Sequence, residues 1–272
     1  MRAKLLFDIP TALVLAAMYV LLAGNAWLYF HARLPWPLHV LVGALGIHLA
    51  FTVWHEAVHR NASRIGWLND VFGVLGALPY MAPFYLEKWF HLQHHALLNR
   101  SDDPNYIYTD GPLWRLPLRY VRILDYARRR MRDDPRSPLE RWIDRVPLAL
   151  VLALVGTALW RGALLDLIVL WALPFAVSKL VMDWYINWLP HVGLPPDRYR
   201  GTRIVDVAWL TPLVLAHNYH AIHHLWPNLP WHRYRPTFRE KQASLRARGV
   251  PVETRLRGWS THDAVRRDSV SG

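Results

Sequence analysis

Three short segments of the chain are dense in histidine, a side chain that commonly binds metal ions. They are His55-Glu56-Ala57-Val58-His59, His91-Leu92-Gln93-His94-His95 and His220-Ala221-Ile222-His223-His224. Residues three and four apart share a helix face, so each segment can present at least two imidazoles to one point. Together the segments hold eight imidazoles, more than the four ligands of a tetrahedral zinc site. Many neutral nitrogens without a thiolate suit a pair of first-row metal ions, and a dinuclear iron centre is the favoured interpretation.

A fourth group of polar residues ends a long apolar stretch. Asp183, Asn187 and His191 follow one another at intervals of four residues, so they share a face if the helix continues to Pro190. His191 would then be a ninth histidine of the centre, and Asn187 would hold a metal-bound water. A single histidine at a helix end is more often a cap, but the three neighbouring clusters favour the role of ligand.

Apolar stretches long enough to cross a bilayer separate these groups. We expect transmembrane helices at about 9–30, 36–54, 146–160 and 164–188, in two hairpins with short loops. A fifth apolar stretch, 68–86, is interrupted by Gly73, Gly76, Pro79 and Pro83, which predicts a re-entrant or interfacial segment near the metal site. The expected fold is an all-α integral membrane protein with a cytoplasmic histidine-rich cap, forming a single domain over residues 1–272.

The distribution of charge predicts the orientation in the membrane. The chain carries a formal net charge of +12, and the segment Arg115–Arg145 holds ten arginines against five acidic residues. Lys and Arg concentrate on the cytoplasmic side of membrane proteins, so this segment, both termini and the histidine clusters are expected there. Nucleic-acid binding is not expected, because no recognition fold fits between the spans. The chain has no cysteine, which excludes disulfides, iron–sulfur ligation and thiolate-bound haem.

Several motifs resemble those of the membrane fatty acid desaturase and hydroxylase superfamily. The order HxxxH, HxxHH, HxxHH across four spans is similar to its histidine boxes. Within that superfamily, the local sequence is most similar to that of the ferredoxin-dependent β-carotene 3-hydroxylases. The similar segments are His91 to His95, Asp102-Asp103-Pro104, Gly111-Pro112-Leu113-Trp114, Trp188-Leu189-Pro190-His191 and Asn218 to Trp231. The resemblance runs from about His55 to Phe238.

The resemblance implies a centre of two non-haem iron ions that uses O2 and two electrons from an external donor, ferredoxin. The substrate would be an apolar lipid, with the β-rings of β-carotene, hydroxylated to zeaxanthin, favoured. Asn187, four residues before His191, instead resembles the acyl-CoA desaturases, so desaturation of an acyl-lipid or acyl-CoA is the alternative. The implied metal ligands are His55, His59, His91, His94, His95, His191, His220, His223 and His224, with Asn187 as a weak or water-mediated ligand.

Two remote alternatives use only part of the pattern. His55 to His59 also matches HExxH, the zinc protease motif in which Glu56 would be the general base. A zinc protease would leave both HxxHH segments without a role. A histidine-lined metal transporter would place its site near the bilayer midplane, whereas these clusters lie at or beyond the ends of the spans.

Residues next to the boxes are candidates for orienting the imidazoles. His217 precedes His220 by three residues, but only the register that begins at His220 gives HxxHH, so His217 is expected to support the site without binding metal. Glu56, Asp102 and Asp103 are candidate acceptors for imidazole N–H groups.

Overall fold

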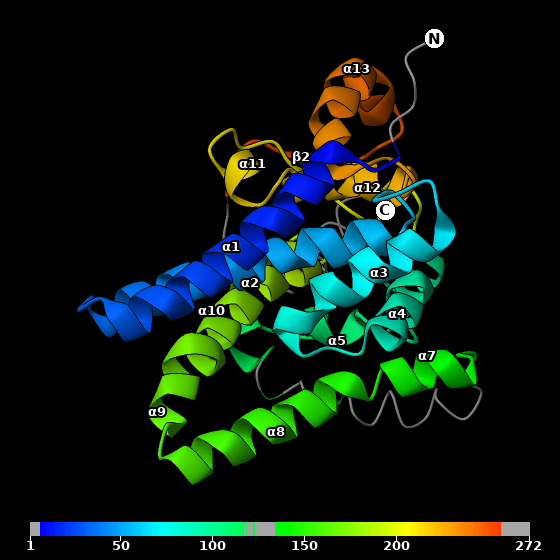
Figure 1. Cartoon of the computed structure of the whole chain (residues 1–272). Coiled ribbons are helices and arrows are strands. Elements are labelled where there is room, and N and C mark those ends of the chain that lie inside the picture. The colour runs from blue at the N-terminus through cyan, green and yellow to red at the C-terminus, as the bar shows by residue number, and fades with distance from the viewer. Residues whose placement is uncertain (1–5, 117, 119–121, 123–133, 257–272) are drawn as a thin grey trace. The chain divides into compact units, whose positions relative to one another are not determined.

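A computed structural model describes residues 6–116, 118, 122 and 134–256 (Figure 1). The chain divides into two compact units, each built from two separate stretches. The first unit comprises Met1–Lys88 with Arg136–Val181, and the second comprises Trp89–Pro135 with Met182–Gly272. The single domain over 1–272 stays a prediction. Both chain ends and much of the segment Arg115–Arg145 lie outside the described residues, so their cytoplasmic location stays a prediction as well.

Four helices in the described part of the chain are long and apolar enough to cross a membrane. They are Ile9–His31, Trp36–Val58, Pro138–Arg161 and Leu164–Trp188. This confirms the expected all-α integral membrane class. The first and last agree closely with the sequence-based bounds. The second extends four residues further, and the third begins earlier because the short helix α7 (Pro138–Ile143) directly precedes α8 (Val146–Arg161).

Helices α1 (Ile9–His31) and α2 (Trp36–Val58) lie side by side as an antiparallel pair joined by a short loop (Figure 1). Over its most apolar window α2 is 56% buried, against 11% for each of the other three candidate spans. Small residues permit this close packing. A Cβ on Gly46 would lie 2.8 Å from the Leu22 side chain of α1, and one on Gly76 would lie 2.6 Å from the Trp54 backbone of α2. Thus α2, which ends in the first histidine pair, is the central helix of the first unit.

The last candidate span is not α-helical throughout. It runs through α9 (Leu164–Leu167), the π-helical turn η4 (Ile168–Ala172), α10 (Leu173–Met182) and a second π-helical turn, η5 (Asp183–Trp188). A π turn holds more residues than an α turn and often lies at a functional site. The expectation that Asp183, Asn187 and His191 share one α-helical face is therefore wrong: the helical turn ends at Trp188 and His191 lies in the turn that follows.

The stretch 68–86 folds as a helix, a tight turn and the start of another helix. Helix α3 (Gly66–Ala77) is followed by the 3-10 turn η1 (Leu78–Tyr80) and by Met81 in the left-handed conformation, φ 49°. Its Phe72 and Ala77 belong to a core cluster of the first unit. The expected interruption by proline is thus present, while a re-entrant position in the membrane stays a prediction.

Helix α4 (Phe84–Leu97) carries the second histidine box. The Asp144 carboxylate accepts hydrogen bonds from the backbone N–H groups of Tyr85 and Leu86 in its first turn, each 2.9 Å long. These bonds supply acceptors that a helix lacks at its start. Tyr85, Leu86 and Asp144 all belong to the first unit, so these bonds join its two stretches to each other.

The second unit is built mostly from short elements, with two buried apolar clusters among its described residues. Its elements include α5 (Tyr106–Thr109), η2 (Leu113–Arg115), β1 (Ile204–Val205), α11 (Leu210–Leu213), η6 (His217–Tyr219), α12 (His220–Leu225), η7 (Trp231–Arg233), α13 (Tyr234–Ala247) and β2 (Val252–Glu253). The two strands pair in parallel, with Ile204 opposite Val252. Helix α13 packs its buried Tyr234 and Phe238 against the segment of the third histidine box (Figure 1).

Candidate metal centre

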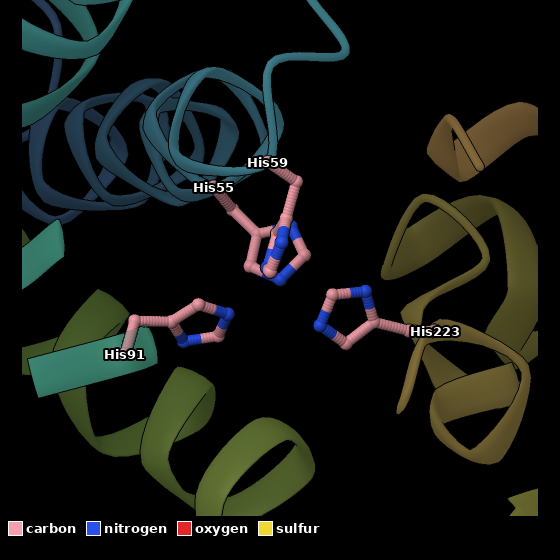
Figure 2. Close-up of side chains that lie close together, drawn as sticks. All are labelled: His55, His59, His91 and His223. Atoms are coloured by element: carbon pink, nitrogen blue, oxygen red, sulfur yellow. The ribbon is translucent and has the colours of Figure 1, made fainter. Parts of the chain in front are cut away.

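The first histidine box lies at the carboxyl end of α2. His55 is in the last turn and His59 is the residue after the helix, and both are buried. Their ring centroids are 5.0 Å apart, and Figure 2 shows both rings leaving the same face of α2. Burial lowers the pKa of His59 to about 3, so its imidazole is neutral near pH 7, the form that binds metal ions. Glu56, which is fully buried, lies 3.5 Å from Nδ1 of His55.

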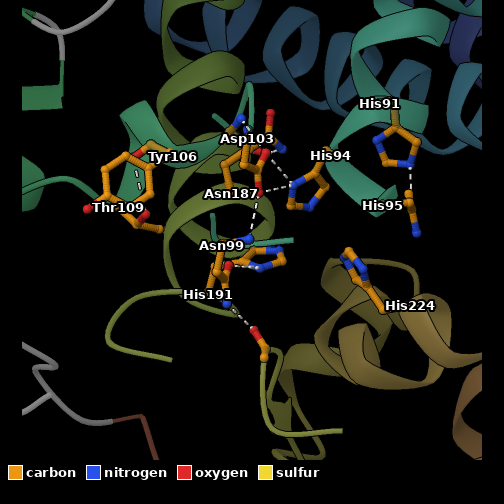
Figure 3. Close-up of polar contacts among 12 residues, drawn as sticks. His91, His94, His95, Asn99, Asp103, Tyr106, Thr109, Asn187, His191 and His224 are labelled. Carbon is orange, nitrogen blue, oxygen red and sulfur yellow. Dashed lines mark hydrogen bonds and ion pairs between the residues drawn. The ribbon is translucent and has the colours of Figure 1, made fainter. Parts of the chain in front are cut away.

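The histidine side chains of the second box point in two directions from α4. His91 and His95, four residues apart, bring their Nε2 atoms within 3.1 Å of each other. The His94 ring faces another way, and its Nδ1–H donates to the Asp103 carboxylate, with both oxygens at 2.9 Å (Figure 3). Asp103 is 2% exposed, as expected for a residue that orients an imidazole. The neighbouring candidate Asp102 is exposed, so only one of the two acidic residues lies in the site.

The third box occupies the short helix α12. His220 and His224 hold their Nε2 atoms 3.0 Å apart. His223 has Nε2 at 2.9 Å from Nε2 of His95 and Nδ1 at 3.1 Å from the hydroxyl of Tyr234. The second and third boxes therefore meet within the second unit.

His191 joins this group from the turn after η5. Its ring centroid lies 4.7 Å from that of His94 and 4.9 Å from that of His220. Burial first, and the neighbouring His94 second, hold the pKa of His191 well below its usual value. Burial and the neighbouring His95 do the same to the pKa of His224. Both imidazoles are therefore neutral near pH 7.

Two groups of ring nitrogens in the second unit have the spacing of metal ligands. In one, the nitrogens of His94, His191, His220 and His224 all lie within 4.8 Å of one another; in the other, those of His95, His223 and His224 do. Two nitrogens that each bind one ion at about 2.1 Å lie roughly 3.0 to 3.4 Å apart, close to the short distances seen here.

Nε2 of His94 and Nε2 of His191 are buried and have no hydrogen-bond partner among the described residues. Leaving a buried polar atom unpaired costs about 1 to 3 kcal/mol, which a bound cation would remove. These buried and convergent imidazoles therefore fit a metal ion.

Asn187 has both ends of its amide engaged. Its Nδ2 donates to Asp183 at 2.8 Å, and its Oδ1 accepts from Nδ2 of Asn105 at 3.2 Å. An amide oxygen can accept a second hydrogen bond, so a water at Asn187 is compatible with these contacts. Its role as a weak or water-mediated ligand stays a prediction.

The structure also separates ligand candidates from supporting residues. His217 lies outside the histidine groups found among the described residues, and its buried ring contacts Tyr234, 5.9 Å between centroids. Asn99, Asn105 and Tyr234 contact the site but were not expected from the sequence. The only sequence signal for Asn99 was an asparagine just beyond a helix end, a common position for that residue.

A groove of about 420 Å³ opens beside the histidines of the second unit. His95 and His224 form part of its wall, together with Arg100, Asp197 and Arg198. Both arginines are exposed. The groove thus gives solvent and solutes a positively charged approach to the histidine group.

Comparison with known proteins gives several relatives. The chain is 23% identical over 230 residues to an sn-1 acyl-lipid omega-3 desaturase (ferredoxin) of Nostoc sp., covering 77% of this chain and only 54% of that desaturase. It is 26% identical over 249 residues to a beta-carotene ketolase of Paracoccus sp., covering 84% of this chain and 94% of the ketolase. A Delta(9) fatty acid conjugase-like enzyme of Dimorphotheca sinuata is 25% identical over 255 residues, covering 74% of this chain and 67% of that enzyme.

A family model described as fatty acid desaturase matches residues 31–255, a range that includes all three histidine boxes and His191. Since the match extends over most of the sequence, the protease and transporter alternatives no longer have support. The chain therefore belongs to the fatty acid desaturase family.

Proposed function

We propose that this membrane protein is a non-haem diiron oxidoreductase that hydroxylates an apolar lipid, with the β-rings of β-carotene as substrate and zeaxanthin as product. The observation that carries the proposal is the convergence of buried and half-buried imidazoles from the second box, the third box and His191. Two iron ions would supply the reductive activation of O2 that an unactivated C–H bond requires. Each hydroxylation converts one C–H bond, O2, two electrons and two protons to one C–OH bond and water.

We assign the metal ligands by joining this group to the first box. His55 and His59 offer two more buried imidazoles, and that of His59 is neutral near pH 7, the form that metal binding requires. The proposed ligands are His55, His59, His91, His94, His95, His191, His220, His223 and His224, with Asn187 as a weak or water-mediated ligand.

The side chains around the metal centre determine its net charge and the orientation of its imidazole rings. Imidazoles leave a metal pair more positive than carboxylates would. Asp103 accepts from His94 and Tyr234 contacts His223, so these partners hold two rings at fixed angles. The position of the substrate carbon next to the metal centre determines whether oxygen is inserted or a second hydrogen is removed.

Two observations favour a carotenoid and hydroxylation. The Asn218–Trp231 segment resembles the carotenoid hydroxylases, and the β-carotene ketolase is similar over nearly its whole length. A ring carbon held in a narrow pocket presents one hydrogen at a time, which favours insertion of oxygen.

Desaturation of a fatty acyl chain is the second candidate. Asn187 supports it, and so do the acyl-lipid desaturase and the conjugase-like enzyme among the relatives. The chain spans about half the length of that desaturase, so the similarity leaves the substrate class open to experiment.

We propose that ferredoxin or a similar acidic protein delivers the electrons. The name of the Nostoc desaturase includes ferredoxin, and the groove beside His95 and His224 is flanked by Arg100 and Arg198. Complementary charge speeds the encounter of redox partners. A donor docked at this groove would lie next to His95 and His224. We propose that this face is cytoplasmic, in agreement with the concentration of arginine in Arg115–Arg145.

One expression experiment tests the proposed substrate. The gene is expressed in a host that makes β-carotene and supplies ferredoxin, and pigments and lipid acyl chains are analysed from the same cells. The expected products are cryptoxanthin and then zeaxanthin, absent from cells that express His220→Ala. New acyl double bonds with unchanged carotenoids would establish the desaturase alternative. A keto group on the ring would contradict hydroxylation and indicate the chemistry of the ketolase.

A further inference from the structure

Asn99 lies two residues beyond the carboxyl end of α4, between the second histidine box and Asp103. Its φ is 58°, in the left-handed region that asparagine tolerates better than most residues other than glycine. Its backbone N–H donates to Oδ2 of Asp103 at 2.8 Å. Asp103 in turn accepts from Nδ1–H of His94, so the Asn99 backbone already fixes the partner of one candidate ligand.

The side chain of Asn99 reaches the turn that carries His191. Its Nδ2 faces three backbone carbonyls, those of Leu194 at 3.2 Å, Pro195 at 3.1 Å and Gly201 at 2.6 Å. Only the nitrogen of an amide can donate, so these carbonyls determine which way the amide is turned. Oδ1 is left to face Nδ1 of His191, 3.2 Å away (Figure 3).

This arrangement determines the tautomer of His191. An amide oxygen only accepts, so Nδ1 of His191 must carry the proton and Nε2 must carry the lone pair. Nε2 of His191 is buried and, like Nε2 of His94, has no hydrogen-bond partner among the described residues. Both imidazoles therefore present the nitrogen that points into the four-histidine group.

We propose that Asn99 is a positioning residue of the metal centre: its backbone holds Asp103 against His94, and its amide holds His191 in the metal-binding tautomer. The inference rests on the proposed function, because it assumes that the four-histidine group binds iron. Partners that orient metal-bound histidines typically change metal affinity about 10- to 100-fold when removed.

Two substitutions separate this role from a role in folding. Asn99→Gly keeps the left-handed backbone and the N–H to Asp103 but removes both the acceptor for His191 and the donor to the three carbonyls. Asn99→Asp keeps an oxygen acceptor for His191 but loses the donor to the three carbonyls. Asn228→Gly, at an exposed asparagine four residues after His224 and outside the histidine groups found among the described residues, is the control.

The full-length protein is purified in detergent, stripped of metal and titrated with Co²⁺ and with Fe²⁺ under anaerobic conditions. The Kd comes from the visible Co²⁺ absorption, and the melting temperature is measured without metal. We expect Asn99→Gly to weaken metal binding about 10- to 100-fold and to change the Co²⁺ spectrum. We expect Asn99→Asp to bind within a few-fold of wild type while its metal-free form melts at a lower temperature.

Equal metal affinity in wild type and Asn99→Gly would overturn the role of Asn99 and leave the proposed function intact. Equal losses of affinity in both variants, in proportion to their losses of melting temperature, would show that Asn99 acts only in folding and would also overturn it. A wild-type protein that takes up no metal would refute the proposed function itself, and the inference with it.

Discussion

The Nε2 atoms of His95 and His223 lie 2.9 Å apart, although 128 residues separate the two histidines in the chain. The same atom of His95 is 3.1 Å from Nε2 of His91. Imidazole nitrogens at such distances share either a proton or an ion, and an ion can satisfy several of them at once. The convergence of three lone pairs on one small region is the physical basis for a metal centre.

Metal content is the first prediction. Protein purified anaerobically in mild detergent and reconstituted with Fe²⁺ should hold about two iron atoms per chain, measured by elemental analysis. Removal of the metal by a chelator should lower the melting temperature, because an ion bound only by the folded state stabilises it. A fixed content of one zinc, together with peptidase activity, would contradict the diiron assignment.

The third histidine box distinguishes a ligand from a supporting residue. His220→Ala should abolish activity and lower the iron content, since His220 belongs to the four-histidine group. His217→Phe should keep the iron and lose only part of the turnover, because His217 contacts Tyr234 and lies outside the groups among described residues. The reverse pattern would show that the ligand register begins at His217.

Asp103 and Asp102 form a matched pair of substitutions. Asp103→Asn should weaken Co²⁺ binding about tenfold or more, because a neutral amide is a weaker acceptor for Nδ1–H of His94 than the carboxylate is. Asp102→Asn, one residue away and exposed, should leave the Kd for Co²⁺ unchanged. Equal effects at both positions would indicate a general effect of charge and would rule out orientation of His94.

The basic groove predicts where the electron donor acts. Arg100→Glu and Arg198→Glu should raise the KM for ferredoxin several-fold, and the effect should shrink at high salt, because screening weakens attraction between charges. Turnover with a small chemical reductant should be unchanged in both variants. Arg239→Glu, exposed on α13 and absent from the groove, is the control. An unchanged KM in both groove variants would place the donor elsewhere.

Membrane topology can be measured with reporter fusions and cysteine labelling, which is clean because the native chain has no cysteine. We expect the segment Arg115–Arg145 and both termini to face the cytoplasm, with the loops near Arg33 and Arg161 on the other side. If positions in Arg115–Arg145 were labelled from outside intact cells, the segment would face away from the cytoplasm. The histidines would then be out of reach of cytoplasmic reductants, which would contradict the proposed reaction.

Much of the molecule followed from local sequence patterns. Uninterrupted apolar stretches of about 20 residues give the same spans in almost any membrane protein, because each span satisfies its own backbone hydrogen bonds. The pairing of His91 with His95 and of His220 with His224 likewise follows from residues four apart on a helix.

The sequence by itself determined the class of protein, the spans and the histidines that could bind metal. Only the tertiary structure decided that His191 meets His94 and His220, that Asp103 and not Asp102 lies in the site, and that Asn99 faces His191. Helical periodicity predicts which side chains share a face within one helix. It cannot predict contacts made after a π turn or across a loop, because these depend on how the chain packs between segments far apart in sequence.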